Sequence, residues 1–248
     1  MTETTEASSG RWIDIPSFDG KTLGAYLALP PATPRNRPAP GMVVLQEIWG
    51  VNAHIRAVAD QYASDGYVVL APDLFWRMKP RVDLGYDEAG SKEAYGYRRS
   101  IDLDLADKDI AATVGVLEQM KQVAGGIGVV GYCMGGMLAY RAAARAGIDC
   151  AVCYYGGGIA QQLDIAASIT VPMALHFGAK DAHITPDQVA AIEATLAGRS
   201  NVRIDIYPPA DHGFNCWGRP SYHQQSAALA HGRSLAFFAT HLGVQSAD

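Results

Sequence analysis

The run Gly131-Tyr132-Cys133-Met134-Gly135 places one thiol between two glycines, directly after an apolar stretch and before a helical pattern. This order fits the G-x-nucleophile-x-G turn, in which a strand passes into a helix through a sharp bend. The glycines are needed there because side chains two residues to either side would collide with neighbouring backbone. The bend lifts the sulfur above the sheet and aims the N-terminus of the helix at it. The pattern therefore predicts that Cys133 is a nucleophile.

A nucleophile presented in this way needs an acid and then a histidine, in that chain order. Asp181 follows one predicted strand and His212 follows the next, at spacings of 48 and 31 residues that each leave room for a strand and a helix. We expect His212 to take the thiol proton and Asp181 to fix the tautomer and orientation of the imidazole. His183, two residues after Asp181, is the alternative base.

Glu47 stands at the end of the first predicted parallel strand, where the following loop supplies part of an oxyanion hole in proteins built this way. A carboxylate beside a thiol would hold the proton on sulfur or compete with His212 for it. The alternative is a strand-end carboxylate that faces water. The backbone N–H groups of Ile48 and Met134 are the expected oxyanion donors.

The other three cysteines give weaker signals. Cys150 and Cys153 have the spacing of a redox or metal pair, but they fall in a predicted strand, where this spacing points them to opposite faces. Cys216 lies close enough to His212 along the chain to line the same site. The histidines outside the two loops, His54 among them, are expected to be core or surface residues. No metal and no organic cofactor are expected.

Short apolar segments without alternation, separated by helical patterns, predict a parallel sheet covered on both faces. After an opening hairpin over 11–30 that turns at Asp19-Gly20, the expected strands are 41–47, 67–73, 126–131, 150–156, 171–178 and 201–208. The expected helices are 52–66, about 97–123, 134–147, 185–198 and 221–241. The prediction is a single α/β domain over 1–248, with a doubly wound, mostly parallel sheet of about eight strands and catalytic loops at the carboxyl ends of the strands.

Composition narrows the class of protein. The chain has 248 residues and a net charge of −5, with no run of lysine and arginine that would indicate nucleic acid as a partner. No apolar run reaches the roughly 20 residues that cross a bilayer, so no membrane partner is expected. Residues 1–10 are polar and acidic, which favours a flexible tail over a signal peptide, and 31–40 is a proline-rich surface connection. We expect a cytoplasmic protein with reduced thiols, either a monomer or a small homo-oligomer.

Six segments, taken in order, resemble the dienelactone hydrolase (carboxymethylenebutenolidase) family of the α/β-hydrolases: LQEIWGVN, GYVVLAPDLF, VVGYCMGG, YYGGGI, HFGAKD and PADHGF. The similarity runs from about residue 11 to 242. It implies a cysteine hydrolase with Cys133 as nucleophile, His212 as base and Asp181 as its partner. Glu47 matches the family's glutamate, thought to keep the resting thiol neutral until substrate binding moves it.

The resemblance also implies a set of substrate-binding residues. Arg77 matches an arginine that binds the carboxylate of the lactone substrate. The family's founding members carry a second arginine a few residues after the catalytic histidine, but Cys216 falls at or near that place here, and Arg219 is out of register. The substrate-binding residues expected in this chain are Arg77, Trp49, Tyr155, Phe214 and Cys216.

The resulting interpretation is hydrolysis of a small-molecule lactone or ester through a thioester acyl-enzyme, favouring a dienelactone-type enol lactone that carries a carboxylate. A thiol suits such activated leaving groups, since it expels a poor alkoxide less well than a serine would. Two alternatives stay open. One is a promiscuous small-acyl or aryl carboxylesterase with another natural substrate, and the other is a non-catalytic ligand-binding or thiol-sensing protein on the same fold.

Overall fold

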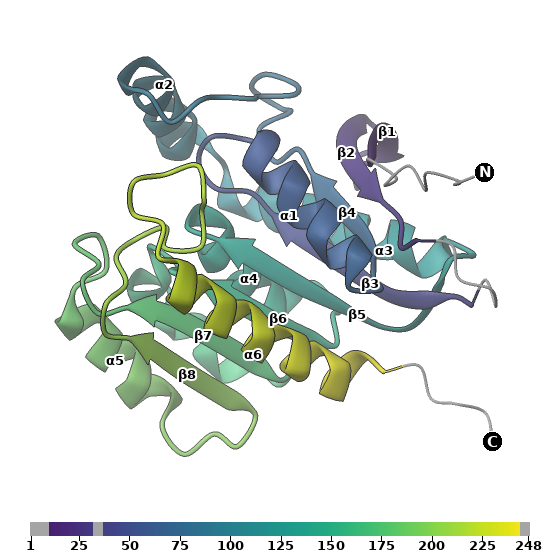
Figure 1. Cartoon of the computed structure of the whole chain (residues 1–248). Coiled ribbons are helices and arrows are strands. Elements are labelled where there is room, and N and C mark those ends of the chain that lie inside the picture. Colours follow the sequence, from purple (N-terminus) through teal and green to yellow (C-terminus); the bar gives the residue numbers. More distant parts are fainter. Residues whose placement is uncertain (1–9, 32–36, 244–248) are drawn as a thin grey trace, which may run out of the picture.

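The computed structural model describes residues 10–31 and 37–243. The fold is built on one eight-stranded sheet in the order β1-β2-β4-β3-β5-β6-β7-β8 (Figure 1). Of the tail expected over 1–10, residues 1–9 lie outside the described residues, as do residues 32–36 of the proline-rich connection.

The strands match the expected ones within a few residues. They are β1 (Arg11–Pro16), β2 (Thr22–Ala28), β3 (Ala39–Leu45), β4 (Val68–Pro72), β5 (Val123–Tyr132), β6 (Cys150–Tyr154), β7 (Met173–Gly178) and β8 (Val202–Tyr207). The opening hairpin is confirmed, because β1 pairs antiparallel with β2. Strand β2 is antiparallel to β4, and every other neighbouring pair is parallel.

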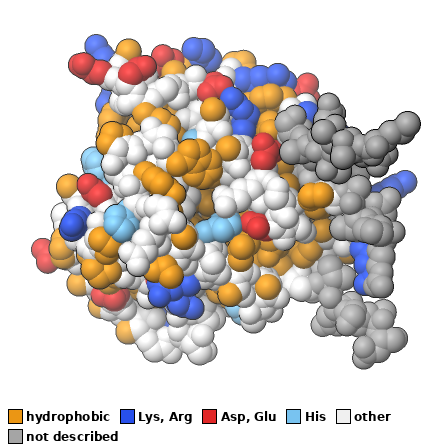
Figure 2. Space-filling model, viewed as in Figure 1, with side chains coloured by type: hydrophobic (Ala, Val, Ile, Leu, Met, Phe, Trp, Pro, Cys, Tyr) orange, Lys and Arg blue, Asp and Glu red, His pale blue; other side chains and the backbone are white. Residues whose placement is uncertain are grey.

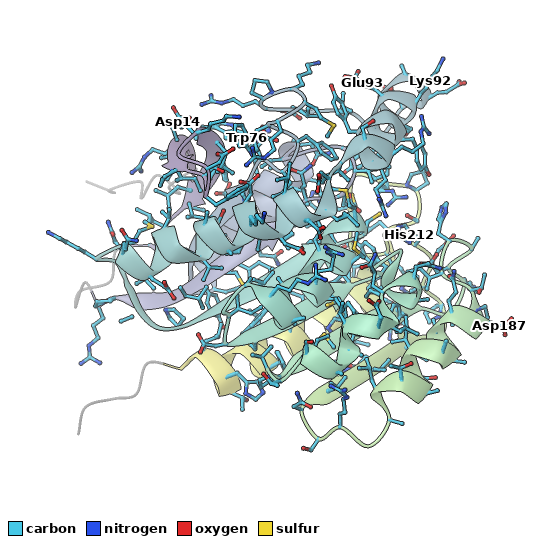
Figure 3. The ribbon with its side chains drawn as sticks, turned by 180° about the vertical axis from the view of Figure 1, so that it is seen from behind. Asp14, Trp76, Lys92, Glu93, Asp187 and His212 are labelled. Carbon is cyan, nitrogen blue, oxygen red and sulfur yellow. The ribbon has the colours of Figure 1, made fainter. Side chains whose placement is uncertain are left out.

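Helices cover both faces of the sheet. They are α1 (Ala53–Ser64), α2 (Glu88–Ser100), α3 (Leu103–Gln119), α4 (Met134–Arg145), α5 (Pro186–Leu196) and α6 (Gln224–Leu242), with two short 3-10 helices, η1 (Ile159–Gln161) and η2 (Leu163–Ser168). Helices α1 and α6 pack on one face, and α3 and α4 on the other (Figures 1 and 3). Within 10–31 and 37–243, no helix has both the length and the apolar character needed to cross a membrane.

The sheet is buried on both sides, as its continuous apolar strands predict. In β4 and β6 every residue is buried, and in β3 only the first two are partly exposed. The doubly wound α/β-hydrolase fold is therefore confirmed. Because β3, β5, β7 and β8 are parallel, the loops at their carboxyl ends meet at one edge of the sheet. On the face shown in Figure 2, acidic and basic side chains are interspersed, and hydrophobic side chains occur in small groups.

The structure differs from the sequence prediction between β4 and β5. The single helix expected over about 97–123 is two helices, α2 and α3, because the chain is extended at Ile101 and a new helix begins at Asp102. The Asp102 carboxylate accepts hydrogen bonds from the N–H groups of Asp104 and Leu105, at 3.0 Å each. A capping aspartate satisfies N–H groups that a continuous helix would have bonded internally, so it favours a helix start over a helix interior. The break lets α2 leave the sheet and reach the edge where the loops meet (Figure 1).

Candidate active site

Cys133 occupies a strained turn between β5 and α4. Its backbone has φ 55° and ψ −114°, in the positive-φ region that non-glycine residues rarely adopt. A Cβ on Gly131 would collide with the carbonyl oxygen of Gly135, and a Cβ on Gly135 would collide with that of Leu45. Both glycines are therefore required by the backbone that presents the half-buried thiol.

The structure brings the predicted acid and histidine to this thiol. Nε2 of His212 lies 3.1 Å from Sγ of Cys133, and Nδ1 of His212 lies 2.8 Å from Oδ2 of Asp181. The other carboxylate oxygen of Asp181 accepts hydrogen bonds from the N–H groups of His183 and Ile184, at 2.7 and 3.0 Å. The carboxylate is thus fixed in orientation and in turn fixes the imidazole. His212 is labelled in Figure 3.

His183, the alternative base, lines the same cavity and packs against His212. The two imidazole rings meet edge to face, with centroids 5.0 Å apart. Of the two histidines, His212 is the one that contacts Cys133.

The electrostatic setting of His212 favours a protonated ring. Burial by itself lowers the pKa of His212, but the charge on the Cys133 sulfur and the hydrogen bonds with Asp181 and Cys133 outweigh it and raise the pKa to about 10. The arrangement can therefore hold a thiolate–imidazolium pair, which is the reactive form of a cysteine nucleophile.

Tyr155 and Phe214 lie behind His212 and do not line the cavity. The Tyr155 ring packs edge to face against His212 with centroids 5.2 Å apart, and against Phe214 at 5.3 Å. Both side chains are fully buried. The structure places these two residues as packing that holds the imidazole, although they were expected to bind substrate.

Glu47 is fully buried and does not face water. One carboxylate oxygen accepts a hydrogen bond from the Tyr86 hydroxyl at 3.3 Å, and the other lies 3.5 Å from Nη1 of Arg219. Burial raises the pKa of Glu47, and the charges of Arg219 and His212 oppose that rise. The buried carboxylate is thus balanced by the charge of an arginine.

A cavity of about 200 Å³ opens over Cys133. It is lined by Ile48, Trp49, Tyr95, Arg98, Cys133, Met134, Gly157, His183, His212 and Arg219. Ile48, Met134 and Trp49 were all expected here. The volume lies below the usual range of about 300–1,000 Å³ for drug-sized ligands, so the cavity favours small substrates.

Arg77 does not reach this cavity. Its guanidinium forms ion pairs with Asp19 at 2.8 Å and with the buried Asp109 at 2.9 Å, and it covers the Trp76 ring at 4.3 Å. These two carboxylates hold it beside a different cavity, between the segment that follows β4 and helix α3. Trp76 and His212 lie well apart in Figure 3.

Two other arginines line the cavity in its place. Arg219 covers the Trp49 ring at 4.9 Å, and a Cβ on Gly213 would collide with its guanidinium. Arg98 comes from α2 and forms no ion pair with any residue in the described part of the chain. Arg98 was not expected here from the sequence, because the path of α2 depends on the helix break at Asp102.

Cys216 is buried beside Glu47 and does not line the cavity. Its thiol donates a hydrogen bond to the Tyr86 hydroxyl at 3.2 Å. His54, which was expected to be a core or surface residue, lies next to both, and burial lowers the pKa of His54 to about 4. Among the described residues, Glu47, His54 and Cys216 could together hold a metal ion, since their ligand atoms all lie within 4.8 Å of one another.

Comparison with known proteins gives consistent matches over most of the chain. Residues 23–242 match the model of the dienelactone hydrolase family. The chain is 33% identical over 228 residues to a carboxymethylenebutenolidase from Pseudomonas putida. This alignment covers 92% of the present chain and 95% of the Pseudomonas protein. The chain is 34% identical over 232 residues to a candidate carboxymethylenebutenolidase from Azospirillum brasilense, covering 93% and 99%. A crystal structure of a candidate dienelactone hydrolase from Klebsiella pneumoniae superposes with a TM-score of 0.82 at 30% identity, covering 94% of this chain and all of that one.

The raised pKa of His212 predicts how its contribution to stability depends on pH. Because folding raises this pKa from 6.5 to about 10, the stabilisation is fully present below pH 6.5 and is lost as pH rises toward 10. The free energy of unfolding should therefore be higher for the unaltered protein than for His212→Gln. This difference should be largest below pH 6.5 and should shrink as the pH rises to about 10. Urea unfolding across this range measures it. Asp181→Asn should narrow the pH range over which this difference is lost, because one of the contacts that raise the pKa of His212 is weakened. A difference in free energy of unfolding that grows with pH would contradict a raised pKa at His212.

Proposed function

Because the chain belongs to the dienelactone hydrolase family, whose members cleave ester and lactone bonds, we propose that this hydrolase opens an enol lactone that carries a carboxylate. The nucleophile is Cys133, the base is His212 and the orienting acid is Asp181. The observation that supports this most strongly is the 3.1 Å contact between the imidazole and the thiol sulfur. A catalytic thiol needs reducing surroundings, so the proposal also places the enzyme in the cytoplasm.

In the first step, His212 takes the thiol proton and the sulfur attacks the carbonyl carbon of the lactone. The carbonyl oxygen becomes an oxyanion that accepts hydrogen bonds from the N–H groups of Ile48 and Met134. Both residues border the cavity, and within the described ranges neither N–H donates to a protein acceptor. In related chemistry, loss of one such donor raises the barrier by about 3 kcal/mol.

In the next step, the tetrahedral intermediate collapses and the bond between the acyl carbon and the ring oxygen breaks. The electron pair leaves on that oxygen as an enolate, which takes up the proton held by the His212 imidazolium, and a thioester remains on Cys133. An enolate is stable enough to leave in preference to the thiolate, whereas a simple alkoxide is not. His212 then removes a proton from water, which attacks the thioester carbon, and the C–S bond breaks to restore the thiolate.

Glu47 takes part through its arginine partner. Arg219 lines the cavity and is the positive charge nearest to this buried carboxylate. A substrate carboxylate that draws Arg219 toward the cavity would leave Glu47 without that charge, so the glutamate would bind a proton more readily. With a proton taken from solvent, Glu47 carries no negative charge, so it no longer disfavours the thiolate that forms when His212 takes the thiol proton, and formation of the thiolate is coupled to the arrival of substrate.

Arg98 and Arg219 receive the substrate carboxylate. Both residues line the cavity over Cys133, while Arg77 is neutralised by Asp19 and Asp109 outside it. Arginine binds a carboxylate through two parallel hydrogen bonds, which fixes orientation as well as charge.

A second candidate function is hydrolysis of small-acyl or aryl esters. Two observations favour it: Arg77 is held away from the cavity, and Cys216 falls at or near the place of the family's second arginine. Such an esterase would use the same Cys133 chemistry on neutral substrates. The two functions therefore differ in whether the cavity arginines contribute to turnover.

The first test concerns the nucleophile. Cys133→Ala should lower kcat for an enol lactone at least about 10⁴-fold, because no other group can form the acyl-enzyme. Steady-state kinetics on the pure, folded protein measures this. Cys150→Ala, whose thiol lies buried in β6, is the matched control and should keep its activity. Unchanged activity of Cys133→Ala would rule out the mechanism.

The second test separates the two candidate functions. Arg98→Gln should lower kcat/KM for a carboxylate-bearing lactone about 30-fold, because a hydrogen bond to a charged group contributes about 2 kcal/mol. The same substitution should leave kcat/KM for neutral aryl esters nearly unchanged. Arg99→Gln, the exposed neighbour on α2, is the control. Equal losses on both substrates, or none on the lactone, would show that Arg98 does not bind the carboxylate. A preference for the neutral ester in the unaltered enzyme would favour the esterase.

A further inference from the structure

Three side chains with metal-binding atoms lie together beside the cavity. Glu47 follows β3, His54 lies in the first turn of α1, and Cys216 lies in the loop after β8. All three are buried, and their ligand atoms lie within 4.8 Å of one another. Residues from three separate segments thus converge on one point, and the proposed reaction uses neither His54 nor Cys216.

His54 is the observation that points to a ligand. Its side chain is 5% exposed, yet neither ring nitrogen has a hydrogen-bond partner among the described residues. A buried polar group left unpaired costs about 1–3 kcal/mol, so such groups are rare and call for an explanation. The ring is held in place by the Trp217 ring, which packs edge to face at 4.4 Å, and one of its nitrogens lies within 4.8 Å of ligand atoms of Glu47 and Cys216.

The donor set selects a class of cation. One thiolate sulfur, one imidazole nitrogen and one carboxylate oxygen are typical zinc ligands, whereas Mg²⁺ and Ca²⁺ prefer oxygen alone. With Cys216 and Glu47 ionised, the set carries two negative charges, which match a divalent cation. Ligands about 2.0–2.3 Å from a tetrahedral zinc ion lie roughly 3.3–3.7 Å apart. The three groups would therefore draw together by up to about 1.5 Å, within the reach of small side-chain rotations.

Arg219 would compete with such a cation for the Glu47 carboxylate. Its Nη1 lies 3.5 Å from the Glu47 carboxylate, and two positive groups cannot share one carboxylate at close range without repulsion. Binding of a cation would therefore release Arg219 toward the cavity.

We propose that Glu47, His54 and Cys216 form a binding site for Zn²⁺ or a similar thiophilic divalent cation, which competes with Arg219 for Glu47. On binding, the Cys216 thiol loses its proton to solvent and a metal–sulfur bond forms. The inference goes beyond the proposed hydrolysis, because no step of that reaction uses the cation. Its tests read out binding and not turnover, so either proposal can fail while the other stands.

The test uses Co²⁺ as a spectroscopic probe in a Cys133→Ser background, which removes the catalytic thiol as a competing ligand. We expect saturable binding with a thiolate-to-cobalt charge-transfer band in the near ultraviolet. The band should disappear in Cys133→Ser/Cys216→Ser and in Cys133→Ser/His54→Phe, where the phenyl ring keeps the packing on Trp217. A band that survives either second substitution, or that is absent from Cys133→Ser but present in the unaltered protein, would overturn the proposal.

Two further measurements keep the test decisive if a double variant fails to fold. X-ray absorption of the zinc-loaded Cys133→Ser protein should show one sulfur at about 2.3 Å with nitrogen and oxygen ligands, and a shell without sulfur would contradict the site. Calorimetry of Arg219→Gln in the same background should show Zn²⁺ binding about tenfold tighter, since a repelling charge is gone. Unchanged or weaker binding would contradict the competition with Arg219.

Discussion

The backbone conformation at Cys133 is the constraint on which the rest of the site depends. A positive φ at this residue turns the chain from β5 into α4 within one residue and carries the sulfur to the edge of the sheet. The turn is possible only because Gly131 and Gly135 carry no Cβ, since either would collide with a backbone carbonyl. The strain stored there is offset by the buried strands and helices on both sides. Once the sulfur is fixed, the loop that follows β8 is enough to bring His212 to it.

The fold and the convergence of Cys133, Asp181 and His212 could be predicted from the sequence, because both follow from local patterns. Continuous apolar strands separated by helices allow few arrangements other than a covered parallel sheet. In that sheet, the carboxyl ends of β5, β7 and β8 share one edge, so Cys133, Asp181 and His212 had to meet there once their strands were recognised. The contact distances of 3.1 and 2.8 Å are consistent with that reasoning.

The residues that line the cavity were harder to predict, because their positions depend on contacts between distant segments. Arg77 follows β4 as expected, but Asp19 and Asp109, which come from the hairpin and α3, hold its side chain elsewhere. Arg98 reaches the cavity only because Asp102 caps a new helix and frees α2 from the sheet. A long charged side chain can point in many directions from one backbone position, so sequence pattern alone does not fix its partner.

The central claim is that Cys133 carries the acyl group during turnover. Rapid acid quenching of the unaltered enzyme with an aryl ester or enol lactone, followed by peptide mass spectrometry, tests it most directly. The account predicts that the mass of the acyl group appears on the peptide containing Cys133 during steady-state turnover and disappears when substrate is exhausted. An acyl group found on another residue, or turnover without any acylated peptide at short quench times, would contradict it.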